Sequence, residues 1–303
     1  LISLGSFDEA LIIFKERLED ATLYRLNASL LRVELLRDLF PDGLDTLPRL
    51  TTTQDQSFIL NSLALGYHFS GKPCPAIPLF EFSDKIYECE NDYEEYSSAL
   101  YNMSNSLRFI GKIYRSENTA RKAFAIDRGH KDRFSEGLSL SLIGLAFALR
   151  GNHEQAEIAL HCSLQILTDQ NHQQSEGLIN AYLAQQALEK EDTAAARPLA
   201  DRAWELAAVC RYEIDFIRAA RLQGSAALHL GDLNTADERL HHALTRARRV
   251  QLVEEELPAL IALAQLHCLQ KEPEKAREML EEVWESAERG PYPLSHADAL
   301  NVL

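Results

Sequence analysis

The sequence predicts an all-α fold, a solenoid of antiparallel helix pairs. First, a small residue followed four positions later by an apolar one recurs along the chain, mostly at intervals of forty residues. Second, short breaks rich in Gly, Asn, Asp and Pro separate the stretches between, as helix termini require. Third, no stretch shows the apolar–polar alternation of a β-strand that would compete with this pattern. A long regular period with these features is typical of stacked helical repeats.

Small residues mark the places where paired helices are expected to cross. In the second helices, the recurring pairs are Ala10/Phe14, Ala120/Phe124, Ala156/Leu160, Ala196/Ala200, Ala236/Leu240 and Ala276/Leu280. In the first helices, small residues stand twelve positions earlier, at Gly144, Ala184, Gly224 and Ala264. Two helices can approach closely only where one of them lacks a large side chain, and the apolar partner then fills the space beside it.

The breaks carry the residues that begin helices. They lie at 150–154, 189–193, 230–234 and 270–274. Asn152, Asp192 and Asp232 are expected N-caps, because their side chains can accept a hydrogen bond from an unpaired backbone N–H. Pro273 suits the first turn of a helix, where no N–H is needed.

This register divides the chain into expected units of one solenoid over 1–303. They are a partial repeat at 1–21, an irregular helix plus connector at 22–57, a degenerate repeat at 58–94, repeats at 95–132, 133–172, 173–212, 213–252 and 253–290, and the start of a truncated repeat at 291–303. The connector has two prolines and a glycine, which favour a loop. The chain begins without Met, in an apolar stretch, so we expect a fragment of a longer protein.

The pattern resembles the tetratricopeptide repeat (TPR) family. The residues that carry the resemblance are Leu140, Gly144 and Phe147 in a first helix and Ala156 and Leu160 in the second. The usual TPR period is about 34 residues. The longer period is similar to the sensor repeats of bacterial MalT-type and STAND signalling proteins and to peptide-sensing TPR regulators of Gram-positive bacteria. The resemblance implies a right-handed superhelix whose first helices line a concave groove.

One short stretch imitates a nucleotide-binding motif. In "GYHFSGKP", residues 66–73, two glycines and Lys72 are spaced as in a P-loop. A working P-loop follows a β-strand and ends in Ser or Thr, whereas here the preceding stretch has helical periodicity and position 73 is Pro. We therefore interpret Gly66 as a helix-crossing residue and Gly71 as a helix terminator.

Composition narrows the classes of partner. The net charge is −15, with 46 acidic against 31 basic residues, which argues against nucleic acid and anionic membranes as general partners. Five scattered cysteines without a C-x-x-C pair indicate a reducing cytosol rather than a zinc site or a disulfide framework. No apolar run is long enough to predict a membrane span.

The resemblance also implies where a ligand would bind, at exposed first-helix positions that face the groove. Carried over by the forty-residue register and the neighbouring polar positions, the candidate residues are Tyr101, Asn102, Asn105, Arg108, Gln185, Arg218, Arg221 and Gln265. Arg218 and Arg221 lie one helical turn apart and favour a ligand carboxylate, a phosphate or an acidic peptide. The alternative is that these side chains are solvated or pair with acids on the next helix.

The expected function is recognition, with no catalytic residue, cofactor or metal. We expect a scaffold module that binds a protein or peptide segment, with acidic groups as one possibility, in the concave groove. The alternative is a ligand-sensing segment of a bacterial STAND-type ATPase or transcription activator that binds a small inducer. A third hypothesis, an enzyme, would require a pocket with a strongly perturbed acid–base pair. The sequence leaves the oligomeric state open.

Overall fold

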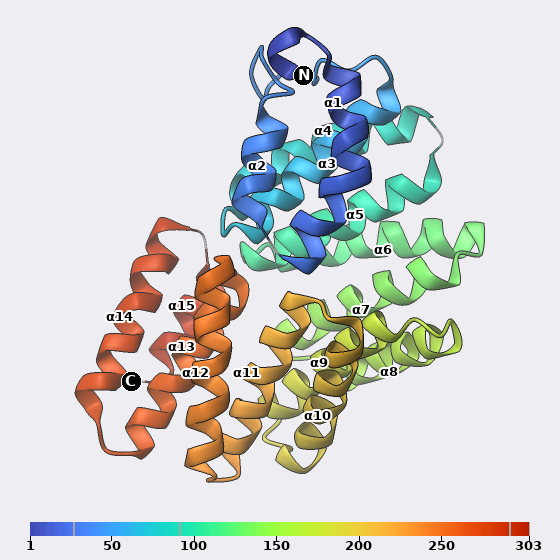
Figure 1. Ribbon diagram of the computed structural model, residues 1–303. Coiled ribbons are helices and arrows are strands. Elements are labelled where there is room, and N and C mark those ends of the chain that lie inside the picture. The colour runs from blue at the N-terminus through green and yellow to red at the C-terminus, as the bar shows by residue number, and fades with distance from the viewer. Residues whose placement is uncertain (27, 91, 291, 303) are drawn as a thin grey trace.

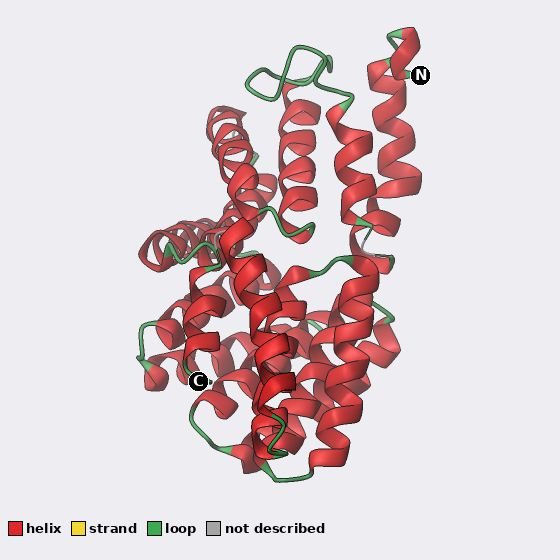
Figure 2. Cartoon of the chain, turned by 90° about the vertical axis from the view of Figure 1, so that its left-hand side faces the viewer, coloured by secondary structure: helices red, strands yellow, loops and turns green. Residues whose placement is uncertain are grey.

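The computed structural model describes residues 1–26, 28–90, 92–290 and 292–302 (Figure 1). Helices joined by short turns make up this part of the chain, and it contains no strand (Figure 2). Consecutive helices pack as antiparallel pairs and build a right-handed α-solenoid, so the predicted fold class is confirmed. No helix in the described ranges is long and apolar enough to cross a membrane.

The helix pairs repeat with a constant spacing. They are α3 (Thr53–Phe69) with α4 (Pro73–Glu90), α5 (Tyr93–Phe109) with α6 (Ile113–His130), α7 (Arg133–Leu149) with α8 (His153–Asp169), α9 (Gln173–Glu189) with α10 (Thr193–Cys210), α11 (Glu213–His229) with α12 (Leu233–Val250), and α13 (Val253–Leu269) with α14 (Pro273–Arg289). The first helices begin at 53, 93, 133, 173, 213 and 253, forty residues apart each time. A last short helix, α15 (Pro293–Leu300), packs on α13 and α14.

The N-terminal region forms a further pair of helices. After η1 (Ile2–Leu4), α1 (Phe7–Ile13) continues through the wider turns η2 (Phe14–Leu18) and η3 (Ala21–Arg25). Helix α2 (Ser29–Arg37) then packs on α3, and a loop follows over 38–52. Helix α3 begins five residues before the expected repeat start at 58, because the Thr52 hydroxyl caps it by accepting from the backbone N–H of Asp55.

Small residues hold the paired helices close together. A Cβ added at Gly144 would lie 2.9 Å from Leu160 Cγ, and one added at Gly224 would lie 2.7 Å from Leu240 Cγ. Real side chains do not approach so closely, so each crossing depends on the missing Cβ. These pairs are the ones that the forty-residue pattern predicted.

The helix starts also follow the sequence. Asn152, Asp192 and Asp232 each accept a hydrogen bond from the backbone N–H three residues on, and Pro273 occupies the first turn of α14. The predicted caps are therefore confirmed. They fix where each helix begins and hence which residues of the first helices face inward.

The stretch that imitates a P-loop is the end of a helix. Gly66 lies within α3, where a Cβ would sit 2.9 Å from Val33 Cγ2 on α2. Gly71 has a φ of 77°, and the backbone N–H of Lys72 closes the helix end on Tyr67 O at 2.9 Å. Both glycines thus serve packing and helix termination, as interpreted from the sequence.

The solenoid curves until its two halves meet. A Cβ added at Gly71 would lie 2.5 Å from Val253 Cγ2, and one added at Gly111 would lie 2.6 Å from Pro293 Cγ. Phe69 packs against the apolar cluster that contains Ile217. In Figure 1 the blue N-terminal helices stand above the orange and red C-terminal ones. Turns after α3 and α5 therefore touch the starts of α13 and α15 and close a ring.

Candidate ligand site in the central cavity

The ring encloses a cavity of about 530 Å³, which we call the central cavity. Its walls come from the first helices of successive pairs, α3, α5, α7, α9, α11 and α13, together with Glu19 and Leu23 of the N-terminal helix. Second helices stay outside, because each pair turns its first helix toward the axis of the superhelix. The volume is in the range of pockets that hold small ligands.

Aromatic and amide side chains form much of its lining. Phe58, Tyr101 and Tyr182 contribute apolar faces from different helices. Asn102 donates to Asn61 Oδ1 at 3.2 Å, and Asn105 lies 3.3 Å from the Nε2 atom of His68. These contacts fix the orientation of the amides at the edge of the cavity.

Tyr101 and Tyr182 offer neutral hydroxyl groups. Burial raises the pKa of Tyr101 well above its usual value and raises that of Tyr182 as well. Both side chains can therefore donate and accept hydrogen bonds without contributing charge.

A buried network of charges borders the cavity where the halves of the ring meet. Glu255 accepts from Arg218 Nε at 2.6 Å and from Arg221 Nε at 2.7 Å. Glu254 accepts from Arg218 Nη2 at 3.1 Å. On its other side, Glu254 faces His68 Nε2 at 3.7 Å, an approach across the two halves of the ring.

The network keeps Glu254 and Arg218 charged. Burial opposes ionisation of Glu254, yet His68, Arg218 and Arg108 outweigh it and hold the pKa of Glu254 at about 2. Burial likewise opposes the charged form of Arg218, but Glu255 and Glu254 hold its pKa well above the usual value. The arginine charges are thus balanced within the protein.

The residues expected in the groove lie at three kinds of position in the structure. Four of them line the central cavity, namely Tyr101, Asn102, Asn105 and Arg218. Three lie beside it in the polar network: Arg108 donates to Asn105 Oδ1 at 2.8 Å, and Arg221 donates to Gln185 Oε1 at 3.0 Å. Gln265 is exposed on α13 and is not a lining residue of the described cavity.

The exposed position expected for Arg218 and Arg221 needs correction. Their side chains are only 9% and 10% exposed, and both pair with acids of α13, the next first helix. The two arginines therefore follow the alternative expectation, because they pair with acids on a neighbouring helix. The reason is steric and electrostatic, since stacked first helices bring residues about 34 to 37 positions apart into contact.

No sequence pattern singles out several of the lining residues. His68 lies in the stretch that imitates a P-loop, and Glu254 belongs to a run of three glutamates in which nothing distinguishes one side chain. Asp215 stands three residues before Arg218, one turn along the same face, and that spacing was the available signal.

Within the described ranges, the remaining carboxylates of the cavity have weak cationic partners. Asp215 accepts from Gln174 Nε2 at 3.0 Å, and Arg218 approaches it only to 3.9 Å. Burial raises the pKa of Asp215 although Arg218 opposes the shift. Burial also raises the pKa of Glu19 and of Glu95. Among the described lining residues, negative charge is therefore not fully balanced.

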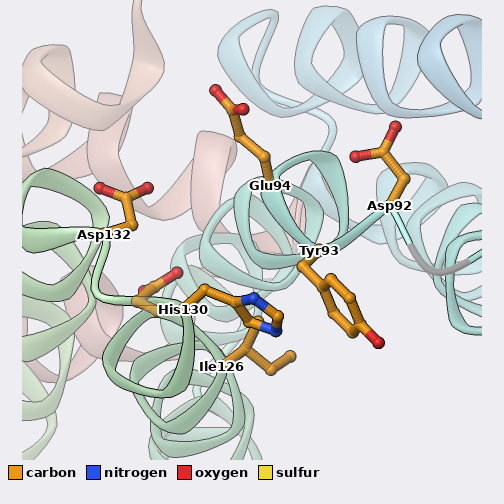
Figure 3. A pocket seen from close by; sticks show the side chains of 7 residues that line it. Asp92, Tyr93, Glu94, Ile126, His130 and Asp132 are labelled. Atoms are coloured by element: carbon orange, nitrogen blue, oxygen red, sulfur yellow. The ribbon is translucent and has the colours of Figure 1, made fainter.

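A second hollow opens on the outside, between the starts of α5 and α7 and the end of α6 (Figure 3). Tyr93 and His130 stack there with their ring centroids 3.9 Å apart. Its acidic residues have structural tasks: Asp92 and Asp132 cap α5 and α7, and Asp127 accepts from Ser97 and Ser139. In Figure 3 the carboxylates of Asp92 and Glu94 point away from the two rings. The hollow is therefore accounted for by helix capping.

In the described ranges, no group of three or more His, Cys, Asp and Glu side chains is arranged to hold a metal ion. The Cys89 side chain, one of the five cysteines considered above, lies outside the described residues.

Comparison with known proteins gives matches among solved structures. No family model matches the chain, and no curated protein sequence matches it. A Rap protein complexed with Competence and Sporulation Factor superposes with a TM-score of 0.73 at 14% identity, over 93% of this chain and 74% of that one. The Rap conjugation gene regulator of the plasmid pLS20, in complex with the Phr* peptide, gives 0.69 at 13% identity, over 90% and 75%.

A third structure extends the comparison to signalling ATPases. A STAND protein with a tetratricopeptide repeat sensor from Pyrococcus horikoshii superposes with a TM-score of 0.58 at 14% identity, over 98% of this chain and 44% of that one. The fold is a TPR-like α-solenoid. At such low identities these likenesses show the fold of the TPR-like array alone, and its site has to be judged from its own residues.

Proposed function

We propose that this TPR-like array is a recognition module that binds a short peptide or an extended protein segment in the central cavity. The observation that carries the proposal is the convergence of six first helices on one cavity with aromatic, amide and charged groups in its lining. Such a mixture buries apolar side chains while its polar groups fix orientation.

The geometry favours holding a ligand over catalysing a reaction. Glu254 and Arg218 pair with each other, and Arg218 also pairs with Glu255, so these charges serve the structure. Asn102 and Asn105 remain at the edge, where amides can pair with the backbone of an extended peptide. Two of the similar structures are Rap proteins bound to a factor or a peptide, which supports the same type of ligand.

The likeness to a STAND sensor supports a second candidate. The superposition on that protein covers 98% of this chain and 44% of that one. In this version the same cavity binds a small inducer, and the array passes the signal to other domains in the cytoplasm. A cavity ligand that is not a peptide would favour this candidate.

Peptide selection tests the first proposal. Displayed random heptapeptides are selected on the chain, and the enriched sequences are synthesised and titrated by calorimetry. Ser98 is exposed and lines the cavity, so Ser98→Trp should fill the cavity without disturbing the fold. We expect Ser98→Trp to weaken binding by at least about tenfold, as loss of a buried anchor does.

The matched control is Ala194→Trp, at an exposed position on the second helix α10. It should leave the affinity unchanged. Equal affinities in both variants would move recognition outside the central cavity and overturn the proposal, as would a selection that enriches no binding sequence.

A further inference from the structure

The charges that line the central cavity are unequal. Among the residues that the structure describes, four carboxylates line it, those of Glu19, Glu95, Asp215 and Glu254, against one guanidinium, that of Arg218. Arg218 is occupied by Glu255 at 2.6 Å and by Glu254 at 3.1 Å. Three carboxylates are therefore left to the cavity.

Those three carboxylates have mostly neutral partners. Asp215 accepts from the amide of Gln174, and Glu95 accepts from the hydroxyl of Tyr87 at 3.4 Å. Lys15 and Arg32 act on Glu19 over distance, but burial outweighs them. Each raised pKa has burial as its main cause, so the local positive charge does not compensate for the lost water.

Aromatic rings line the same cavity as these carboxylates. Phe58 and Tyr101 line the part of the cavity formed by α3 and α5, and Tyr182 and Tyr212 line the part formed by α9 and α11. The face of an aromatic ring attracts ammonium and guanidinium groups, and the attraction grows when water is excluded. Within the protein, Arg218 already lies over the Tyr182 ring at 5.8 Å.

We propose that the ligand of the central cavity carries positive charge, as an ammonium or a guanidinium group that pairs with Asp215 or with Glu19 and Glu95. This inference rests on the proposed function and names its ligand class. It reverses the sign expected from Arg218 and Arg221, because an acidic ligand would meet unbalanced carboxylates, whereas a cation neutralises them. A basic peptide and a free organic amine share this chemistry.

Charge-matched probes test the proposal. Three pools of capped hexapeptides share the same random apolar and amide positions, and their two fixed positions hold Lys/Arg, Gln or Glu. Agmatine and spermidine serve as free amines. Titration of the wild-type chain should show the basic pool binding about tenfold more tightly than the glutamine pool, and the acidic pool most weakly. The differences should shrink as salt is raised.

Two neutral variants locate the charge. Asp215→Asn and Glu95→Gln keep the size of each side chain and should each reduce the preference for the basic pool several-fold. Glu154→Gln, on the exposed first turn of α8, is the matched control and should not change it. Amines that bind as tightly as the basic pool would identify a small cation as the ligand. Amines that bind weakly would identify a peptide.

The outcomes separate this inference from the proposed function. Preference for the acidic or the glutamine pool, lost in Ser98→Trp, would overturn the positive charge and leave recognition in the cavity standing. A basic preference that survives both Asp215→Asn and Glu95→Gln would also overturn the inference. Binding that is unaffected by Ser98→Trp would overturn the proposed function itself.

Discussion

At the scale of single residues, Glu254 links the two halves of the ring. It accepts from Arg218 of α11 and faces His68 and Arg108 of α3 and α5. Its side chain is 12% exposed, and removing its charge would take the facing carboxylate from Arg108 and leave Arg218 paired with Glu255 alone. The penalty for an unpaired buried charge exceeds the gain from forming the pair.

We therefore expect Glu254→Gln to lower the free energy of unfolding by about 3 kcal/mol, the lower end for a broken buried pair. Chemical denaturation followed by circular dichroism measures it. Glu278→Gln, on the exposed face of α14, is the control and should change the free energy by less than about 0.5 kcal/mol. A similar small change at Glu254 would show that the network does not stabilise the ring.

The pH dependence of stability gives a second measurement of the same residue. The folded pKa of Glu254, about 2, lies below the usual value of 4.5, so its contribution is fully present above pH 4.5. The contribution is lost as the pH falls through about 2, because protonation then occurs in the folded state too. Between these pH values, the stability difference between wild type and Glu254→Gln should shrink on acidification. A difference that stays constant there would contradict the lowered pKa.

The pairing partners of single residues could not be predicted from the sequence. The forty-residue register brought Arg218 and Arg221 to the inner side of the array, and the structure has them there. Which acid each arginine meets depends on the rotation between stacked helices, which no local pattern encodes. For the same reason, the approach of His68 to Glu254 was not predictable, since it joins residues brought together only by closure of the ring.

At the scale of elements, the crossing of α11 and α12 depends on Gly224. A Cβ there would approach Leu240 Cγ at 2.7 Å and the backbone nitrogen of Leu240 at 3.1 Å. The helix pairs were predictable because this requirement recurs at Gly144 and is met by Ala elsewhere in the register. The N-terminal pair was less predictable, because its helix widens at Phe14–Leu18 and again at Ala21–Arg25 and breaks the period.

We expect Gly224→Ala to destabilise the array by about 1 kcal/mol, because overpacking costs about 1–3 kcal/mol and the better helix propensity of Ala returns about 1. Gly129→Ala is the matched control within a helix, since a Cβ there meets nothing within 4 Å. That variant should stabilise by up to about 1 kcal/mol. Thermal denaturation of both variants measures whether Gly224→Ala lowers and Gly129→Ala raises the stability. Stabilisation by Gly224→Ala would refute the close crossing.

At the scale of the whole molecule, closure of the ring converts an open groove into a cavity. An open solenoid would contact its neighbours only along the chain. Here the turn after α3 also touches the start of α13, where an added Cβ at Gly71 would lie 3.2 Å from Val253 Cβ. Cysteines that form a disulfide have Cβ atoms about 3.5–4.5 Å apart, so a small shift would allow a bond at this contact.

A double variant, Gly71→Cys with Val253→Cys, in a chain whose native cysteines are serine, should therefore form a disulfide on oxidation. The bond should raise the free energy of unfolding by about 2–4 kcal/mol, less the strain of a non-glycine residue at a φ of 77°. Gly151→Cys with Val253→Cys is the control, because Gly151 occupies an equivalent turn with nothing within 4 Å. Gel mobility without reductant measures disulfide formation in both double variants. Equal cross-linking in the two would contradict the closed ring.

The cross-linked chain then reports how a ligand enters. A ring that must open to admit a peptide should bind the selected peptide more slowly once it is locked, and reductant should restore the rate, because the disulfide removes the opening motion. The equilibrium affinity should change little, since the locked state is the one that forms the cavity. Stopped-flow binding with and without reductant measures the rate. An unchanged rate would mean that the peptide enters past the N-terminal helix, where Glu19 and Leu23 form the remaining wall.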